Sequence, residues 1–306
     1  MWRSYQPDEP LDPRVSSEGR EPTAGDPPKT DEAREQVSSD GLAASNREPE
    51  HSATRPPETR IVYEIRGRTY RLRNSEIAAM VELGKFRVVA REDLAEFAYG
   101  GKNDRMRPDL ENLVRQGLVA IKSIPHEELG SRQLLTLAKN GHRFLVQTGS
   151  AAKGQSLYYG FAQPREAHHD ADLYRVYQKA AAKIVNEGGR NLRVVLDYEL
   201  KKHLYRDLAK LGKDRNSVEA KETVAQRHGL HVVRGKIHLP DVRIEYETRD
   251  GERARVDLEL ATGHYRGRNL AEKVLAGFSL YAHAEDVSKL KRALDERELT
   301  AEILSL

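Results

Sequence analysis

The stretch LPDVRIEYETRDGERARVDLELATGHY, residues 239–265, decides the fold of the C-terminal half of the chain. Apolar and polar residues alternate on both sides of its central RDG, which predicts an antiparallel hairpin with one buried and one solvent-exposed face. A three-residue loop from Arg249 to Gly251 puts glycine at the position that needs a left-handed backbone. This loop fixes the register and sets Val242 opposite Leu258.

The same register pairs the polar residues on the face expected to be exposed. Three of these pairs join an acid to a base, the last being Arg243 with Asp257. The fourth sets Asp241 opposite Glu259, which is destabilising unless a cation or a shared proton lies between them. Carboxylate oxygens suit Mg²⁺ or Mn²⁺, which can activate water and stabilise phosphate charge. The sequence therefore predicts a metal site formed by Asp241, Asp257 and Glu259.

The composition predicts a partly unfolded protein without a membrane segment. Of the 306 residues 32% are charged, and the mean hydropathy is −0.73. Residues 1–59 are rich in Pro, Glu, Ser and Arg, so we expect a disordered tail there. No apolar run approaches the roughly 18 residues of a membrane span, and the start lacks a secretory signal. We therefore expect a cytoplasmic protein with no membrane partner.

Cysteine and charge content limit the possible ligands. The chain has no cysteine, which excludes disulfides and thiolate zinc sites, so any metal must be held by oxygen or imidazole. The net charge of +3 does not by itself indicate a nucleic-acid partner. Local basic clusters such as RGRTYRLR, residues 66–73, have two interpretations. One is a surface that follows a phosphate backbone, and the other is an ordinary solvated face.

Residues 60–147 have the element order of a winged helix-turn-helix. The patterns predict a helix, a second helix ending at Gly117, a strand, a wing and another strand. GLV at 117–119 and the L-T-x-x-x-x-G segment at 135–141 resemble landmarks of that family. The resemblance implies that the second helix enters the major groove of double-stranded DNA. The residues that would face DNA are Lys102, Asn103, Arg105, Arg107 and Arg115. The alternative is a winged helix used for protein contacts or dimerisation.

A linker is predicted over residues 148–169 and an α/β domain over residues 170–306. The patterns predict a helix from Asp170, a strand at NLRVVLDY, two helices, the hairpin, a helix over NLAEKVLAGFSLYAHA and a short last strand at TAEILSL. The fold class is therefore α/β (α+β): a winged helix-turn-helix followed by a small mixed-sheet domain.

The acidic residues of the hairpin resemble the PD-(D/E)xK nuclease core. Pro240-Asp241 is followed by a strand bearing Glu259 and then by a helix. In that core a lysine stands two positions after the second acid, where this chain has Ala261; aligning Asp257 instead puts Glu259 at the lysine position. Some members take the lysine from the following helix, which here offers Lys273. The resemblance implies that Asp241, Glu259 and Lys273 are the catalytic residues.

Taken together, the tail, the winged helix and the nuclease-like domain resemble the replication-relaxation family of plasmids and conjugative elements. The resemblance implies a DNA-binding accessory protein that works with replication or mobilisation proteins. Because Ala261 occupies the lysine position, we expect a nuclease-like domain that has lost its activity. The alternatives are an active Mg²⁺-dependent DNA endonuclease or nickase, and a winged-helix transcriptional regulator.

Overall fold

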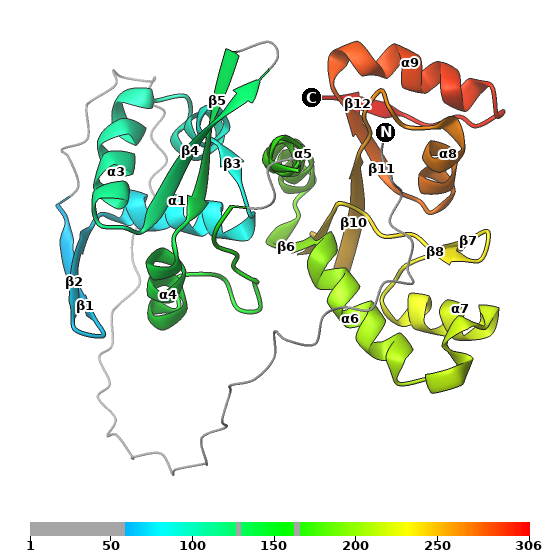
Figure 1. Cartoon of the computed structure of the whole chain (residues 1–306), viewed down its shortest axis with the longest axis horizontal. Helices are drawn as coiled ribbons and strands as arrows, with labels where there is room; N and C mark the ends of the chain where they lie inside the picture. The colour runs from blue at the N-terminus through cyan, green and yellow to red at the C-terminus, as the bar shows by residue number, and fades with distance from the viewer. Residues whose placement is uncertain (1–58, 127–129, 162–165) are drawn as a thin grey trace, which may run out of the picture. The chain divides into compact units, whose positions relative to one another are not determined.

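The hairpin of residues 239–265 forms the middle of a five-stranded mixed sheet (Figure 1). β9 (Val242–Glu247) pairs antiparallel with β10 (Arg253–Leu260), and Val242 lies opposite Leu258, which confirms the predicted register. Gly251 ends the loop with a φ of +84°, as the three-residue turn requires. The sheet order is β12-β11-β10-β9-β6, with β6 antiparallel to β9 and with β11 and β12 parallel to their neighbours. The outer strands are β6 (Arg190–Leu196), β11 (Ser279–Ala282) and β12 (Ile303–Ser305).

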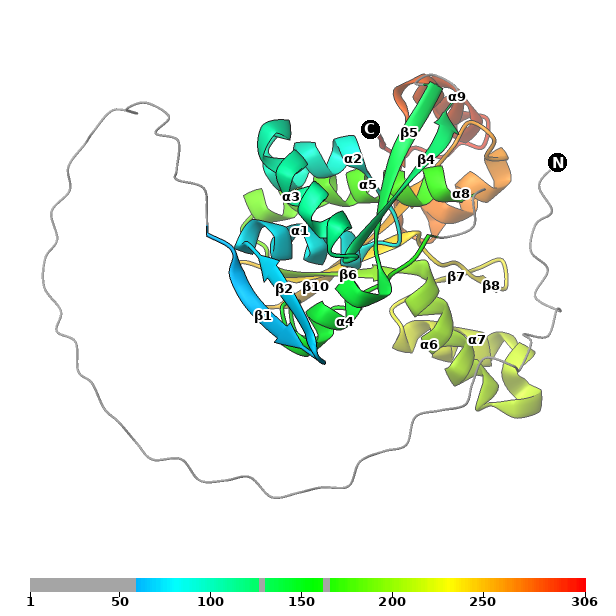
Figure 2. The same cartoon turned by 60° about the vertical axis from the view of Figure 1, so that its left-hand side comes forward.

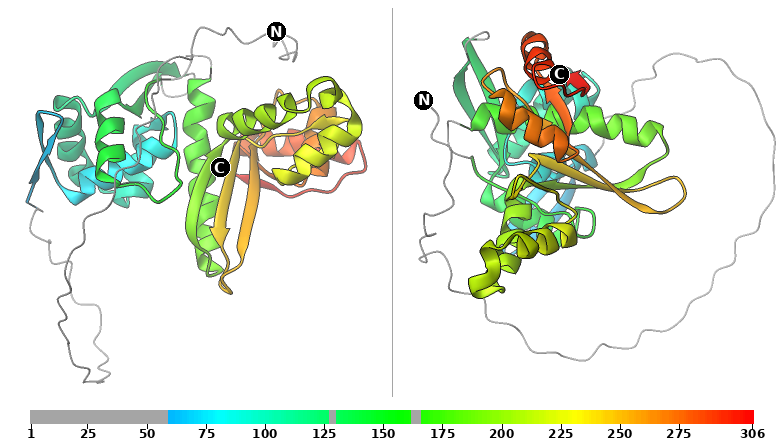
Figure 3. Two further views of the ribbon diagram at one scale, coloured as in Figure 1. Left: turned by 90° about the horizontal axis from the view of Figure 1, so that it is seen from below. Right: turned by 90° about the vertical axis from the view of Figure 1, so that its right-hand side faces the viewer.

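Helices cover both faces of this sheet. α5 (Ala167–Asn186) lies along the face formed by the apolar residues of β6, β9 and β10 (Figure 3). α8 (Gly267–Leu275) and α9 (Ala284–Asp295) pack around β11 and β12 in a second apolar cluster. The chain between β6 and β9 contains α6 (Asp197–Ala209), η2 (Gly212–Asn216), α7 (Val218–Arg227), β7 (Val232–Val233) and β8 (Lys236–Ile237).

The polar face of the hairpin is covered at one end, contrary to the prediction that it is exposed. Arg243 is 3% exposed and Glu259 is fully buried. The guanidinium of Arg243 donates to the carbonyls of His228 and Gly229, just after α7, at 2.6 and 3.0 Å. Only the residues near the turn, such as Arg253, stay exposed as predicted. The segment inserted between β6 and β9 therefore shields a face that alternation alone assigns to solvent.

The predicted helix over NLAEKVLAGFSLYAHA is wrong in its second half. α8 ends at Leu275, and Gly277 has a φ of +80°, a conformation that glycine adopts without strain. β11 begins at Ser279 and runs parallel to β10, so its apolar residues are buried on both sides like those of an internal parallel strand. The final strand, predicted at TAEILSL, is confirmed as β12.

The described residues of 60–148 form five helical segments, a two-stranded hairpin and a three-stranded antiparallel sheet of order β3-β5-β4 (Figure 1). Gly141 is required where α4 meets the backbone, because a Cβ there would lie 2.1 Å from the carbonyl oxygen of Leu118. In chain order the elements are β1 (Ile61–Ile65), β2 (Arg68–Leu72), α1 (Asn74–Lys85), β3 (Val89–Ala90), α2 (Arg91–Asp93), the π-helical turn η1 (Leu94–Ala98), α3 (Asn103–Arg115), β4 (Val119–His126), β5 (Gly130–Leu137) and α4 (Lys139–Thr148).

The computed structural model describes residues 59–126, 130–161 and 166–306. The predicted disordered tail, residues 1–59, lies outside them except for its last residue. The described residues form a mixed α/β fold, and none of their helices is long and apolar enough to span a membrane.

A buried ionic network joins α5 to the N-terminal sheet. Arg132 of β5 donates to Asp172 of α5 at 2.8 Å and to Asp93 of α2 at 3.1 Å. Arg175 of α5 also donates to Asp93, whose side chain is fully buried. His283, at the end of β11, lies 3.1 Å from Asp172. One hydrophobic core runs alongside this network, from Tyr70 to Tyr281.

Replacement of Arg132 by methionine should strongly destabilise the fold. The variant keeps much of the apolar stem but leaves Asp93 and Asp172 buried with one cationic partner fewer, which typically costs about 3–5 kcal/mol. Urea unfolding measures the change. Arg91→Met is the control, because Arg91 bonds the neutral Gln133, and it should change stability by less than about 0.5 kcal/mol. Equal effects of the two variants would contradict a structural role for the network.

Candidate functional site

Three predicted catalytic residues meet where β9 begins and β10 ends. Asp241 immediately precedes β9, Glu259 is the penultimate residue of β10, and Lys273 lies in α8. The ammonium of Lys273 is 2.7 Å from Glu259 Oε1 and donates to the carbonyl of Leu239 at 2.8 Å. The hydroxyl of Tyr265 donates to the same Glu259 oxygen at 2.6 Å. The lysine that the sequence places in the following helix thus reaches the acidic pair.

Backbone contacts fix the position of Asp241. Its carboxylate accepts the N–H of Leu260 at 2.9 Å, and its carbonyl accepts the N–H of Asp197, the first residue of α6, at 3.2 Å. From α5, the imidazole Nε2 of His169 lies 3.6 Å from Asp241 Oδ2. The Asp241 side chain keeps 22% of its surface exposed, so the site is open to solvent on this side.

The charges of the site are unequal. Burial, and then the nearby Asp241 carboxylate, raise the pKa of Glu259 to about 7 against the opposing effect of Lys273. Burial also disfavours the ionised form of Asp241, but His169 and Lys273 lower its pKa. Although burial disfavours the imidazolium of His169, its contact with Asp241 raises the pKa to about 9. At neutral pH the pair therefore holds an ionised aspartate beside a glutamate near its midpoint.

The acidic pair fits a divalent cation. Glu259 Oε2 is buried and has no hydrogen-bond partner among the described residues, so an acceptor atom beside Asp241 is unsatisfied. A cation there would remove the repulsion between the two carboxylates. Because only two carboxylates converge, water or phosphate oxygens would complete the coordination shell that Mg²⁺ requires.

The predicted third ligand, Asp257, does not join the pair. Both of its oxygens accept hydrogen bonds from Arg243, at 2.6 and 2.8 Å. Within residues 59–126, 130–161 and 166–306, no cluster of three His, Cys, Asp or Glu residues is arranged to hold a metal. The predicted ligand set of three acids therefore reduces to Asp241 and Glu259, because Arg243, itself held by backbone carbonyls, neutralises Asp257.

Sequence reasoning missed Tyr265 and His169. Tyr265 lies six positions after Glu259 in the loop before α8, and a phenol next to a candidate acid is a signal that could have identified it. His169 belongs to α5, far from the hairpin in sequence. Only the fold brings it to Asp241.

The predicted DNA-contacting residues all lie on or next to α3 and are exposed. They do not share one face: Arg105 and Arg107 are two positions apart and so project about 200° apart around the helix. Arg107 forms an exposed ion pair with Glu111 at 2.9 Å, and Arg115 donates to Asn112 at 2.8 Å. Lys102 and Asn103 stand at the start of the helix.

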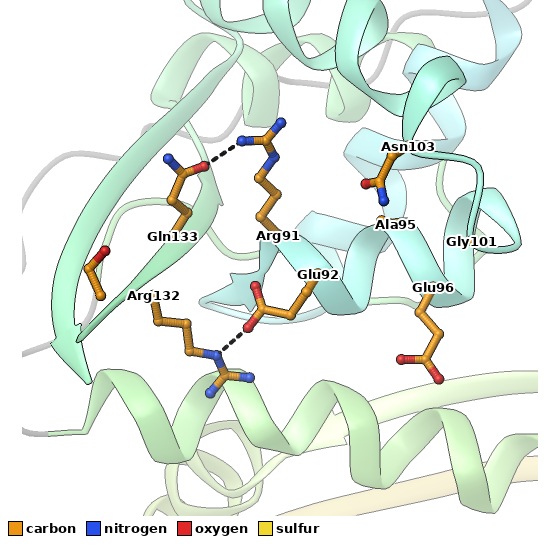
Figure 4. Close-up of a pocket in the computed structure, with 9 residues that line it drawn as sticks. Arg91, Glu92, Ala95, Glu96, Gly101, Asn103, Arg132 and Gln133 are labelled. Atoms are coloured by element: carbon orange, nitrogen blue, oxygen red, sulfur yellow. Dashed lines mark hydrogen bonds and ion pairs between the residues drawn. The ribbon is translucent and has the colours of Figure 1, made fainter. Parts of the chain in front are cut away.

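A polar hollow of about 420 Å³ lies beside the start of α3 (Figure 4). Arg91 projects into it and donates to the neutral Gln133 at 2.7 Å, whereas Arg132 donates to Glu92 at 2.6 Å. Because this partner is neutral, the positive charge of Arg91 next to α3 is not paired with an acid among the described residues. The lining residues are Arg91, Glu92, Ala95, Glu96, Gly101, Asn103, Ser131, Arg132 and Gln133.

Comparison with known proteins gives no family for the chain. No protein-family model matches it. No curated protein matches it either.

Glu259→Gln should increase stability at high pH in the presence of EDTA. Because the folded-state pKa of about 7 exceeds the unfolded value of about 4.3, ionisation of Glu259 destabilises the fold as pH rises between the two. The variant cannot ionise, so its free energy of unfolding relative to wild type should grow by up to about 3 kcal/mol between pH 4.5 and pH 8.

Chemical denaturation at the two pH values measures this difference. Glu222→Gln, on the exposed surface of α7, is the control and should show no comparable trend. A Glu259→Gln protein that is less stable than wild type at pH 8 would show that Glu259 is stabilised by its charge.

Proposed function

We propose that the chain is a DNA-binding protein whose five-stranded sheet carries a divalent-metal-dependent nuclease centre of the PD-(D/E)xK type. The observation that carries this proposal is the position of Lys273, whose ammonium is 2.7 Å from Glu259 Oε1. Ala261 is buried at the usual lysine position. α8 therefore supplies the cation that the strand lacks.

The order of elements supports the same proposal. Asp241 precedes β9, β10 carries Glu259, α8 brings Lys273 to Glu259, and β11 then continues the sheet parallel to β10. Each group enters the site from a different element, and each is held by at least one backbone or side-chain contact. Such support is what a preorganised catalytic site requires.

Each residue of the candidate site has a separate role in the proposed reaction. Asp241, kept ionised by His169, and Glu259, once deprotonated, would hold Mg²⁺ or Mn²⁺. A bound ion of this kind activates water and stabilises the charge of a phosphate. Lys273 places a positive charge where negative charge develops on the phosphate, and Tyr265 fixes the carboxylate of Glu259.

The DNA-binding part of the proposal rests on residues 60–147, which we interpret as a winged helix. α2 and η1 lead through two left-handed glycines, Gly100 and Gly101, into α3, and β4 and β5 form a hairpin in the position of a wing. The β1–β2 hairpin, with the basic run 66–73, is attached next to the end of α3 because Gln116 bonds the backbone of Arg71 (Figure 2). These elements give an exposed basic surface for double-stranded DNA.

Arg107→Ala combined with Arg115→Ala should weaken duplex binding by about tenfold at moderate salt. Each lost phosphate contact also reduces the slope of log affinity against log salt by about 0.9. Gel-shift titration of the full chain at two salt concentrations measures both quantities. The charge-matched control is Lys139→Ala with Arg143→Ala on the exposed surface of α4. Equal losses in both variants would refute specific recognition through α3.

Mn²⁺ should raise the melting temperature of the wild-type chain, because binding to the folded state alone stabilises it. Asp241→Asn should abolish the rise. The wild type should also cleave plasmid DNA in Mn²⁺, and Lys273→Met should reduce the rate at least a hundredfold while retaining the melting response. A wild type that neither responds to Mn²⁺ nor cleaves DNA would refute the metal centre.

A second candidate function is a non-cleaving accessory protein of plasmid replication or mobilisation that acts with proteins of those processes. The observations that favour it are the complete burial of Glu259 and the neutralisation of Asp257 by Arg243, which leave few oxygens for a metal. Under this alternative the wild type cleaves no DNA in Mn²⁺, whatever the effect of the metal on the melting temperature.

A further inference from the structure

We infer that the outer face of α6 binds an unpaired DNA strand and leads it to the acidic pair. This inference rests on the proposed nuclease function and names its substrate as DNA with a single-stranded segment. The face consists of Tyr198, Lys201, Lys202, Tyr205 and Arg206, all of which are exposed. We call it the α6 face.

The α6 face is produced by the helical period. Residues 198, 201, 202 and 205 lie within about 100° of one another around the helix, and residue 206 is adjacent to them. The opposite side carries Leu200 and Leu204, which are 7% and 2% exposed and hold the helix to the body of the protein. The tyrosines therefore face outward because the leucines take the core side.

The two tyrosines are unusually exposed for aromatic residues. Tyr198 is 52% exposed and Tyr205 is 49% exposed. The guanidinium of Arg87 lies 4.9 Å from the centre of the Tyr198 ring, so that ring is held in place while half of the residue stays open to solvent. Exposed rings of this kind form stacking platforms for bases. Bases inside a duplex are already stacked on one another, so the platforms select unpaired nucleotides.

The charge of the α6 face matches a phosphate backbone. Lys201 is paired with Asp197 at 2.6 Å, whereas Lys202 and Arg206 form no ion pair with the residues that the structure describes. Two cations beside two rings provide both kinds of contact that single-stranded nucleic acid uses. Seven residues of helix separate the rings by about 10 Å, or about three nucleotide steps of about 3.4 Å.

The position of α6 connects this face to the candidate site. The N–H of Asp197, the residue before Tyr198, donates to the carbonyl of Asp241 at 3.2 Å. The helix then extends away from the sheet, with α7 beside it (Figures 1 and 2). A strand lying along α6 would therefore end at Asp241, with its phosphates near the proposed metal.

Fluorescence anisotropy of the full chain with a labelled oligothymidine of about 20 nucleotides tests the inference. EDTA is present, so binding is measured without cleavage and a failure of the nuclease proposal leaves this result unaffected. Tyr198→Leu with Tyr205→Leu should weaken binding at least tenfold, while Tyr198→Phe with Tyr205→Phe keeps it within about twofold, because phenylalanine still stacks. Affinity for the matching duplex should be unchanged in both variants.

Two further variants make the test specific. Tyr159→Leu removes another tyrosine, 50% exposed but outside the α6 face, and should bind oligothymidine like wild type. Lys202→Gln with Arg206→Gln should lower the salt slope of binding by about 1.4, or about 0.7 for each lost phosphate contact. Unchanged binding by the leucine variant, or an equal loss for oligothymidine and duplex, would overturn the inference.

Discussion

The buried carboxylate of Asp93 is the constraint on which the arrangement of the fold depends. Its side chain is fully buried, burial raises its pKa, and an unpaired charge there would be severely destabilising. Arg132 and Arg175 resolve this problem from two different elements, β5 and α5. The pairing fixes α5 against the N-terminal sheet, and the same helix then covers the C-terminal sheet and brings His169 to Asp241. The contact between His169 and Asp241 therefore depends on the ion pairs of Asp93, which lies far from the candidate site in sequence.

The ammonium of the candidate site comes from a helix and not from the strand that carries Glu259. Ala261, two positions after Glu259 and just beyond the end of β10, is fully buried, so a lysine there would be buried as well. Lys273 reaches the same acid from α8 and is anchored by a backbone carbonyl. For the proposed function the location of the ammonium is what matters, and a helix provides that location as well as a strand would.

Local pattern predicted the parts of this fold that local forces determine. Alternation and the RDG loop gave the register of β9 and β10, because a slip of one residue would have moved every apolar side chain to the wrong face. Gly141 was singled out by its place in the L-T-x-x-x-x-G segment, and the structure gives the steric reason for a glycine there, because a Cβ would lie 2.1 Å from the carbonyl oxygen of Leu118.

Other features depended on tertiary contacts and could not be predicted. The apolar run after Leu275 was read as helix although it forms β11, since a buried strand and a buried helix share that pattern. The burial of Glu259 and the capture of Asp257 both follow from segments packed over the hairpin. No periodicity in the hairpin itself reveals those segments.

The position of α5 also determines whether a chain truncated after α4 can fold. Val88 and Leu134 of the N-terminal part are buried against Ala167 and Ala171, which follow the segment between α4 and α5. Phe86 packs edge-on against Tyr174 with ring centres 5.2 Å apart. A polypeptide ending after α4 would present these apolar side chains to water, and its aggregation would reflect the missing helix rather than any property of α3. The smallest independently folding piece that retains α3 and the β4–β5 hairpin therefore has to include α5.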